Sequence, residues 1–130
     1  MPTHSVKNLR DVENQAPKFG MPDEMQARFA RKALEFEKAG ASLFTLAPNF
    51  RIPFGHSHAE QEEVYVVVRG SGRVKVGDEI LELGELDALR VGPGVMRQWE
   101  AGPDGLEYVA FGTPQTGPDE VEMVPGWWSD

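Results

Sequence analysis

Short runs of alternating hydrophobic and polar residues dominate this chain from residue 42 onward, a pattern typical of β-strands. Turn residues separate the runs at close intervals, as at Gly70-Ser71-Gly72, Gly77-Asp78-Glu79 and Gly92-Pro93-Gly94. Short strands with close turns predict an all-β protein, folded as an antiparallel sandwich or barrel. The predicted strands cover 42–47, 63–69, 73–76, 80–83, 88–91, 96–100 and 106–111.

The pattern is different in residues 1–41, which we interpret as an N-terminal arm. Met25, Phe29, Ala33 and Phe36 recur at roughly helical spacing, in a stretch that begins after a proline and ends at a glycine. We therefore predict a helix over residues 23–39. The alternative is a shorter helix joined to an extended stretch, because part of this segment also fits a strand.

The last segment, residues 113–130, is rich in proline, glycine and acidic residues but ends in Trp127-Trp128-Ser129-Asp130. Each tryptophan buries a large apolar area when it packs. We expect this tail to pack on the barrel or on a second subunit. The chain of 130 residues is then one domain with an arm, a barrel core over 42–112 and this tail.

Composition excludes several kinds of chemistry. The chain has no cysteine, which rules out disulfides, thiolate nucleophiles and cysteine metal ligands. Its net charge of −8 opposes binding to a phosphate backbone, so we predict no nucleic-acid partner. The longest apolar run, residues 64–68, is too short to cross a membrane, and the polar N-terminus resembles no signal peptide. We expect a cytoplasmic protein without a membrane partner.

The candidate chemistry lies in a run that contains two of the three histidines, His56 and His58. Side chains two residues apart in an extended chain point to the same face. Glu63 follows on the next predicted strand and brings a carboxylate to the same region. Two imidazoles and one carboxylate form a donor set suited to a divalent transition metal.

These residues resemble the first motif of the cupin superfamily, in which His-x-His is followed by a glutamate and then a glycine. His56, His58, Glu63 and Gly70 match it, although Phe50 stands where the motif begins with a glycine. The resemblance covers about residues 42–112 and implies a single-domain cupin β-barrel, jelly-roll-like, with a homodimer as its usual assembly. The spacing to the motif glycine favours Glu63, rather than its neighbour Glu62, as the residue that faces the interior.

The second cupin motif is only partly present. With Gly94 aligned to the motif glycine, Leu86 stands at an earlier glycine position, Arg97 at the third metal histidine and Ala101 at a usual asparagine. Arginine is always charged and has no lone pair, so it cannot ligate a metal. The resemblance therefore implies a site of two histidines and one glutamate, with an arginine in the fourth place.

Two functions follow from this arrangement. In the first, His56, His58 and Glu63 bind a divalent metal (Fe, Mn, Ni or Zn), and Arg97 holds an anionic group of a small-molecule substrate, as in a metal-dependent oxidoreductase or isomerase. In the second, the metal is lost and Arg97 pairs with Glu63. The pocket would then bind a small anionic ligand through Arg97, the histidines and Tyr65, as a sensor or carrier. A third interpretation is a hydrogen-bonded interior without any ligand.

Tyr65 shares a strand face with Glu63, so it is a candidate wall of the substrate pocket; core packing explains its position equally well. The sequence indicates no catalytic residue.

Overall fold

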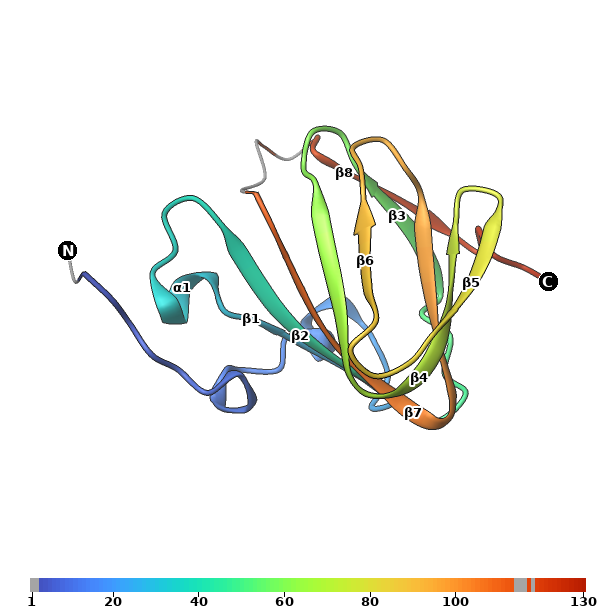
Figure 1. Ribbon diagram of the computed structural model, residues 1–130, viewed down its shortest axis with the longest axis horizontal. Coiled ribbons are helices and arrows are strands. Elements are labelled where there is room, and N and C mark those ends of the chain that lie inside the picture. The colour runs from blue at the N-terminus through green and yellow to red at the C-terminus, as the bar shows by residue number, and fades with distance from the viewer. Residues whose placement is uncertain (1–2, 114–116, 118) are drawn as a thin grey trace.

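A computed structural model describes residues 3–113, 117 and 119–130, and within them eight strands form one curled antiparallel sheet (Figure 1). The strands are β1 (Met25–Phe29), β2 (Gly40–Leu46), β3 (Phe54–His58), β4 (Glu63–Val76), β5 (Glu79–Leu83), β6 (Ala88–Val91), β7 (Arg97–Gly112) and β8 (Val121–Pro125). The helical segments are short: η1 (Leu9–Asp11), η2 (Ala16–Phe19) and α1 (Arg31–Leu34).

Two long strands, β4 and β7, pair along most of their length and bend together, so that the sheet folds over itself. Irregular pairing on either side of Arg69 and Gly70 marks the bend. Gly70 has a φ of 74°, and a Cβ there would lie 2.1 Å from the carbonyl oxygen of Gly105. The motif glycine is therefore required by a close approach of two backbones at the bend.

The bend divides the sheet into two facing layers. In one layer, β1, β2, the second half of β7, the first half of β4 and β6 lie in that order. In the other layer, the order is β8, β3, the first half of β7, the second half of β4 and β5. Buried side chains from both layers, among them Tyr65, Val67, Trp99, Leu106 and Tyr108, fill the space between them. The prediction of an all-β barrel is confirmed.

Four of the predicted strand ranges belong to two longer strands, because the backbone continues through the glycine-containing turns. The ranges 63–69 and 73–76 are parts of β4, and the ranges 96–100 and 106–111 are parts of β7. The predicted strand ranges did not include β1, β3 or β8.

The predicted helix over 23–39 is wrong. Residues Met25–Phe29 form β1, paired with β2, and only Arg31–Leu34 form a helix. Met25 and Phe29, the first two residues of the apparent helical pattern, are four positions apart, and a spacing of four also fits the period of two in a strand. Met25 and Ala27 are buried in alternation, as expected for a strand that covers one face.

The N-terminal arm is attached to the outer surface of the barrel by a buried carboxylate. Arg10 in η1 donates two hydrogen bonds, of 2.7 and 2.6 Å, to the two carboxylate oxygens of Glu107 on β7. Thr45 on β2 donates a third, of 2.8 Å. The arm continues into η2, whose Ala16 is buried against the barrel.

The C-terminal segment also packs on the barrel. Strand β8 pairs with β3 over five residue pairs, whereas β3 and β7 share only the pair His56–Arg97. Trp128 is buried, with 3% of its surface exposed, and the guanidinium carbon of Arg51 lies 3.9 Å from its ring centroid.

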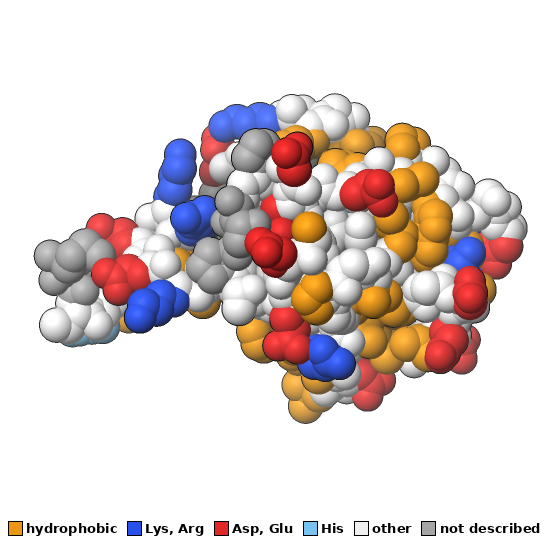
Figure 2. All heavy atoms as spheres, turned by 90° about the horizontal axis from the view of Figure 1, so that it is seen from above, with side chains coloured by type: hydrophobic (Ala, Val, Ile, Leu, Met, Phe, Trp, Pro, Cys, Tyr) orange, Lys and Arg blue, Asp and Glu red, His pale blue; other side chains and the backbone are white. Residues whose placement is uncertain are grey.

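Acidic side chains are scattered over the face shown in Figure 2, with hydrophobic side chains between them. Among the described residues, no helix has the length and apolar character needed to cross a membrane.

Candidate functional site

The histidine strand β3 lies near one edge of its layer and turns one face toward the interior. Phe54, His56 and His58 alternate along it with Gly55 and Ser57. All three residues line the same internal cavity, as the spacing of two residues predicts. The rings of His56 and His58 are edge to face, with centroids 5.1 Å apart.

Glu63, the first residue of β4, faces these histidines from the opposite layer. Its Oε1 atom lies 3.7 Å from Nε2 of His56 and 3.7 Å from Nε2 of His58. One donor atom from each of the three residues lies within 4.8 Å of the others. Its neighbour Glu62 instead lies on the surface, paired with Arg90 at 2.7 Å.

Arg97 lies behind Glu63, with a completely buried side chain. Its Nη2 donates to Oε1 of Glu63 at 2.7 Å, and its Nε donates to the hydroxyl of Tyr65 at 2.9 Å. The Tyr65 hydroxyl in turn donates to Glu63 Oε1. The remaining guanidinium nitrogen, Nη1, donates to the carbonyl oxygen of Val95 at 3.0 Å. Arg97 is thus bound to protein groups through all three of its nitrogens and is absent from the cavity lining.

These contacts determine the charge of each group. Burial by itself raises the pKa of Glu63, but hydrogen bonds from His56 and Tyr65 and the charge of Arg97 lower that pKa from 4.5 to about 2. Burial lowers the pKa of His58, which the Glu63 carboxylate opposes only in part. Burial and the Glu63 charge raise the pKa of Tyr65 well above 10, so its hydroxyl keeps its proton. At neutral pH the site holds an ionised Glu63 and a neutral His58.

A second carboxylate stands on the other side of His58. Oε1 of Glu120 lies 3.6 Å from Nδ1 of His58, and that nitrogen is buried without a hydrogen-bond partner among the described residues. Glu120 also accepts hydrogen bonds from the backbone amides of Glu60 and Gln61, at 3.0 and 2.9 Å. A carboxylate beside Nδ1 favours the tautomer with its proton on Nδ1, which leaves the lone pair of Nε2 directed at the site.

The donor set fits a divalent metal in its chemistry. Metal binding requires a neutral imidazole and an ionised carboxylate, and His58 and Glu63 are in those forms. Two ligands in a tetrahedral site with bonds of about 2.1 Å lie about 3.4 Å apart. The 3.7 Å separations of Glu63 from each histidine are only slightly longer. The positive charge of the buried Arg97 disfavours metal binding. Its Nη2 also donates a hydrogen bond to Oε1 of Glu63, the carboxylate oxygen that faces the histidines.

The cavity beside this site has a volume of about 380 Å³ and a mainly apolar lining. Strands β1, β2 and β7 supply Met25, Phe29, Phe44, Trp99 and Tyr108, while β8 supplies Val121 and Met123. The arm supplies Ala16 and Phe19 from η2, and Met21. His56, His58 and Glu63 belong to the same lining, so the donor set opens onto this cavity.

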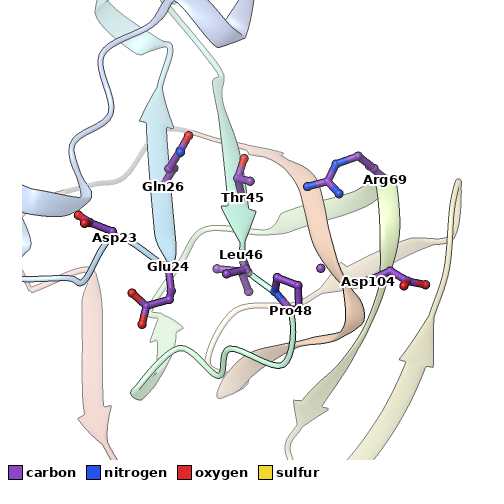
Figure 3. A pocket seen from close by; sticks show the side chains of 10 residues that line it. Asp23, Glu24, Gln26, Thr45, Leu46, Pro48, Arg69 and Asp104 are labelled. Atoms are coloured by element: carbon purple, nitrogen blue, oxygen red, sulfur yellow. The ribbon is translucent and has the colours of Figure 1, made fainter.

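A second depression, of about 160 Å³, lies on the outside of the barrel and is lined by polar groups. Figure 3 shows Arg69 and Asp104 on one side of it and Asp23 and Glu24 on the other. Neither the histidines nor Glu63 belongs to its lining. It is therefore separate from the candidate site.

Comparison with known proteins gives similarity in structure alone: no protein-family model and no curated protein matches the sequence. A cupin protein from Bacteroides fragilis superposes with a TM-score of 0.71 over 91% of this chain and 89% of that protein, at 23% sequence identity. The chain has the cupin fold. The chain is also similar in structure to the polyketide cyclase RemF from Streptomyces resistomycificus, with a TM-score of 0.74, 19% identity and coverage of 97% and 87% of the two chains. A nucleoside dehydratase from Streptomyces gives a TM-score of 0.74 at 14% identity, with 95% of this chain and 92% of that one covered.

The structure brings together all five residues singled out in the sequence: His56, His58, Glu63, Tyr65 and Arg97. Sequence reasoning missed Glu120 and the apolar wall of the cavity. Glu120 lies in a tail whose pairing with β3 has no local signal in the sequence. The wall combines the arm with strands far apart in the chain, so no short motif contains it.

Proposed function

We propose that this protein is a small-molecule enzyme in which His56, His58 and Glu63 hold a divalent metal at the side of the internal cavity. The observation that carries the proposal is the convergence of their three donor atoms at the wall of a cavity large enough for a substrate. When bound, the metal would polarise a substrate oxygen or activate water or dioxygen. The enzymes with this fold named above act on small molecules, which supports the same kind of activity here.

The chain's own residues would prepare the site. Glu120 favours the His58 tautomer whose Nε2 lone pair faces the metal, and Tyr65 and Arg97 keep Glu63 ionised and fixed in position. In this proposal Arg97 acts through Glu63, because its guanidinium is buried behind the carboxylate and bound to protein groups. This differs from the expectation that Arg97 holds an anionic group of the substrate.

The pair formed by Arg97 and Glu63 favours a second candidate, a metal-free ligand-binding protein. A guanidinium nitrogen 2.7 Å from the Glu63 oxygen supplies the positive charge that a metal would otherwise provide. The cavity would then bind a small organic ligand through apolar contacts and hydrogen bonds to the histidines. Metal content separates the two candidates.

The test is elemental analysis of protein purified without a histidine tag or chelator, before and after equilibration with iron, manganese, nickel or zinc. We expect about one metal per chain, and loss of that metal in the variants His56→Ala and His58→Ala. His4→Ala is the matched control, because His4 is exposed in the arm, and it should keep the metal. A metal content near zero under all conditions contradicts the enzyme proposal and leaves the metal-free candidate.

Arg97→His provides a second measurement on the same site. This substitution removes the charge that opposes a metal and adds an imidazole at the position of the third histidine of the cupin motif. We expect a higher affinity for zinc than in the unaltered protein, measured by competition with a chromophoric chelator. Equal or lower affinity in a folded variant argues against a metal at His56, His58 and Glu63. The homodimer stays a prediction, and sedimentation of the untagged chain tests it.

A further inference from the structure

Aromatic rings form a continuous series of contacts along one side of the cavity. Phe19 contacts Phe29 edge to face with ring centroids 6.2 Å apart, and Phe29 contacts Phe44 in the same way at 5.9 Å. Phe44 then stacks on Tyr108 at 5.1 Å, and Tyr108 contacts Tyr65 at 5.5 Å. Tyr65 donates to Glu63. The series therefore runs from Phe19, which is 63% exposed, to the donor set of His56, His58 and Glu63.

Aromatic contacts of this kind are most often ordinary core packing, and the empty volume beside them distinguishes this case. Protein cores are packed like organic crystals, and few of their voids exceed the size of a water molecule. Here the rings of Phe29, Phe44, Trp99 and Tyr108 line a cavity of about 380 Å³. Such a wall can be covered by an incoming molecule.

His56, His58 and Glu63 supply a cluster of polar groups to the cavity lining, with one donor atom of each within 4.8 Å of the others. Gln98 also lines the cavity, but its side chain donates to the carbonyl of Ile52 at 2.6 Å and accepts from the amide of Trp128 at 2.9 Å. No lysine or arginine belongs to the lining that the described residues form. A ligand therefore meets a cluster of hydrogen-bonding groups at the histidines and Glu63, a mainly apolar surface elsewhere, and no lysine or arginine in the lining to pair with an anionic group.

The volume limits the size of the ligand. An apolar cavity of about 150 Å³ accommodates benzene. The cavity of about 380 Å³ thus has room for a molecule of about two or three rings. Flat rings stack or lie edge to face on aromatic side chains, which adds to the free energy gained by burial of apolar area.

We propose that the cavity binds an uncharged, planar aromatic compound of two or three rings that carries a hydroxyl or carbonyl oxygen at one end. The rings lie along Phe29, Phe44 and Tyr108, and the oxygen lies at the histidines and Glu63. Phe19 of η2 forms the entrance. This ligand class makes the proposed function more specific. It rests on the proposed function only for the reaction at the ligand's oxygen, since binding of the rings does not require a metal.

The test compares three probes of similar size by isothermal titration calorimetry: 2-naphthol, its saturated analogue decahydro-2-naphthol, and the anion 2-naphthoate. The protein is measured as purified and again after treatment with a chelator. We expect 2-naphthol to bind at least about tenfold more tightly than the saturated alcohol, because only flat rings make the aromatic contacts. We expect 2-naphthoate to bind the chelator-treated protein at least about tenfold more weakly than 2-naphthol, because its charge would be buried near Glu63 without a cation.

Substitutions locate the binding. Phe44→Leu and Phe19→Ala should each weaken 2-naphthol binding by about 2- to 10-fold, because each removes an aromatic contact. Phe111→Leu is the matched control, since Phe111 is partly exposed and absent from the cavity lining, and it should leave the affinity unchanged. Phe44 is partly buried, so circular dichroism checks the fold of Phe44→Leu; if that variant is unfolded, the exposed Phe19 decides the test.

The inference is overturned if 2-naphthol does not bind, or if the saturated alcohol binds as tightly as 2-naphthol. It is also overturned if 2-naphthoate binds the chelator-treated protein more tightly than 2-naphthol does, or if Phe111→Leu weakens 2-naphthol binding as much as Phe44→Leu and Phe19→Ala do. These outcomes are distinct from failure of the proposed function. Naphthol binding by a protein that takes up no metal under any of the conditions of the elemental analysis refutes the metal enzyme and keeps the ligand class. Metal binding by the histidines without naphthol binding refutes the ligand class and keeps the metal enzyme.

Discussion

Replacing Arg97 with methionine tests whether the buried arginine stabilises the fold through Glu63. Methionine keeps much of the aliphatic part of the side chain, so the substitution mainly removes the charge and the donors. Three hydrogen bonds are lost: to Glu63 at 2.7 Å, to the Tyr65 hydroxyl at 2.9 Å and to the Val95 carbonyl at 3.0 Å. The Glu63 side chain, only 15% exposed, is left without its cation.

Removing one partner of a buried ion pair costs about 3–5 kcal/mol, because the other charge stays buried without compensation. Tyr65 still donates to Glu63 in the variant, and His56 remains close by. We therefore expect Arg97→Met to lower the free energy of unfolding by about 3 kcal/mol, near the lower limit of that range. Urea denaturation at pH 7, followed by the fluorescence of the three tryptophans, measures this quantity.

The double variant Arg97→Met with Glu63→Gln supplies the control. It removes both charges, so its stability should be about 2 kcal/mol higher than the sum of the two single effects predicts. A loss below about 1 kcal/mol in Arg97→Met, together with strict additivity in the double variant, would refute the reasoning.

Three further predictions concern single positions. The pKa of Glu63 is lowered in the folded protein from 4.5 to about 2, so its stabilising contribution is complete well above pH 4.5 and is lost as the pH falls toward 2. Between pH 7 and pH 3, we therefore expect the free energy of unfolding to fall by about 2 kcal/mol less in Glu63→Gln than in the unaltered protein, as measured by urea titrations. Leu86 has a φ of 66° and is 81% exposed, so Leu86→Gly should raise the urea midpoint by an amount equivalent to about 1 kcal/mol, and a lower midpoint would argue against strain at this residue. Gly70→Ala places a methyl group 2.1 Å from the carbonyl oxygen of Gly105, so we expect the free energy of unfolding, measured by thermal denaturation, to fall by more than about 3 kcal/mol. Unchanged stability would show that the two backbones can separate.

The sequence predicted the fold best where side chains alternate between an apolar and a polar environment. Strand β6 (Ala88–Val91) has the predicted bounds, and β5 begins one residue before its predicted range. Strand β2 begins two residues before its predicted range and ends one residue before the end of that range. Strand β3 was missed because its five residues, Phe54–His58, include a glycine, a serine and two histidines, which carry little strand preference. Its position depends on pairing with a segment more than 60 residues later, which no local pattern records.

The candidate site was predictable to the extent that it follows from spacing within short segments. The two-residue interval placed His56 and His58 on one face, and the interval to Gly70 distinguished Glu63 from Glu62. The environment of Arg97 was not predictable, because burial and orientation depend on packing between the two layers. Its pairing with Glu63 was one of two alternatives, and the structure shows that pairing.

The partnership of β3 with β8 has a practical consequence for anyone who shortens or extends this chain. The backbone of the histidine strand is held mainly by Val121–Pro125, which lie within the last ten residues of the sequence and beyond the segment that carries the cupin motifs. A truncated barrel ending near residue 112 would keep both histidines yet present them on an unsupported sheet edge. Affinity tags, reporter fusions and immobilisation chemistry are therefore better attached at the N-terminus, and a deletion series from the C-terminus would lose ligand-binding competence before it loses the rest of the barrel.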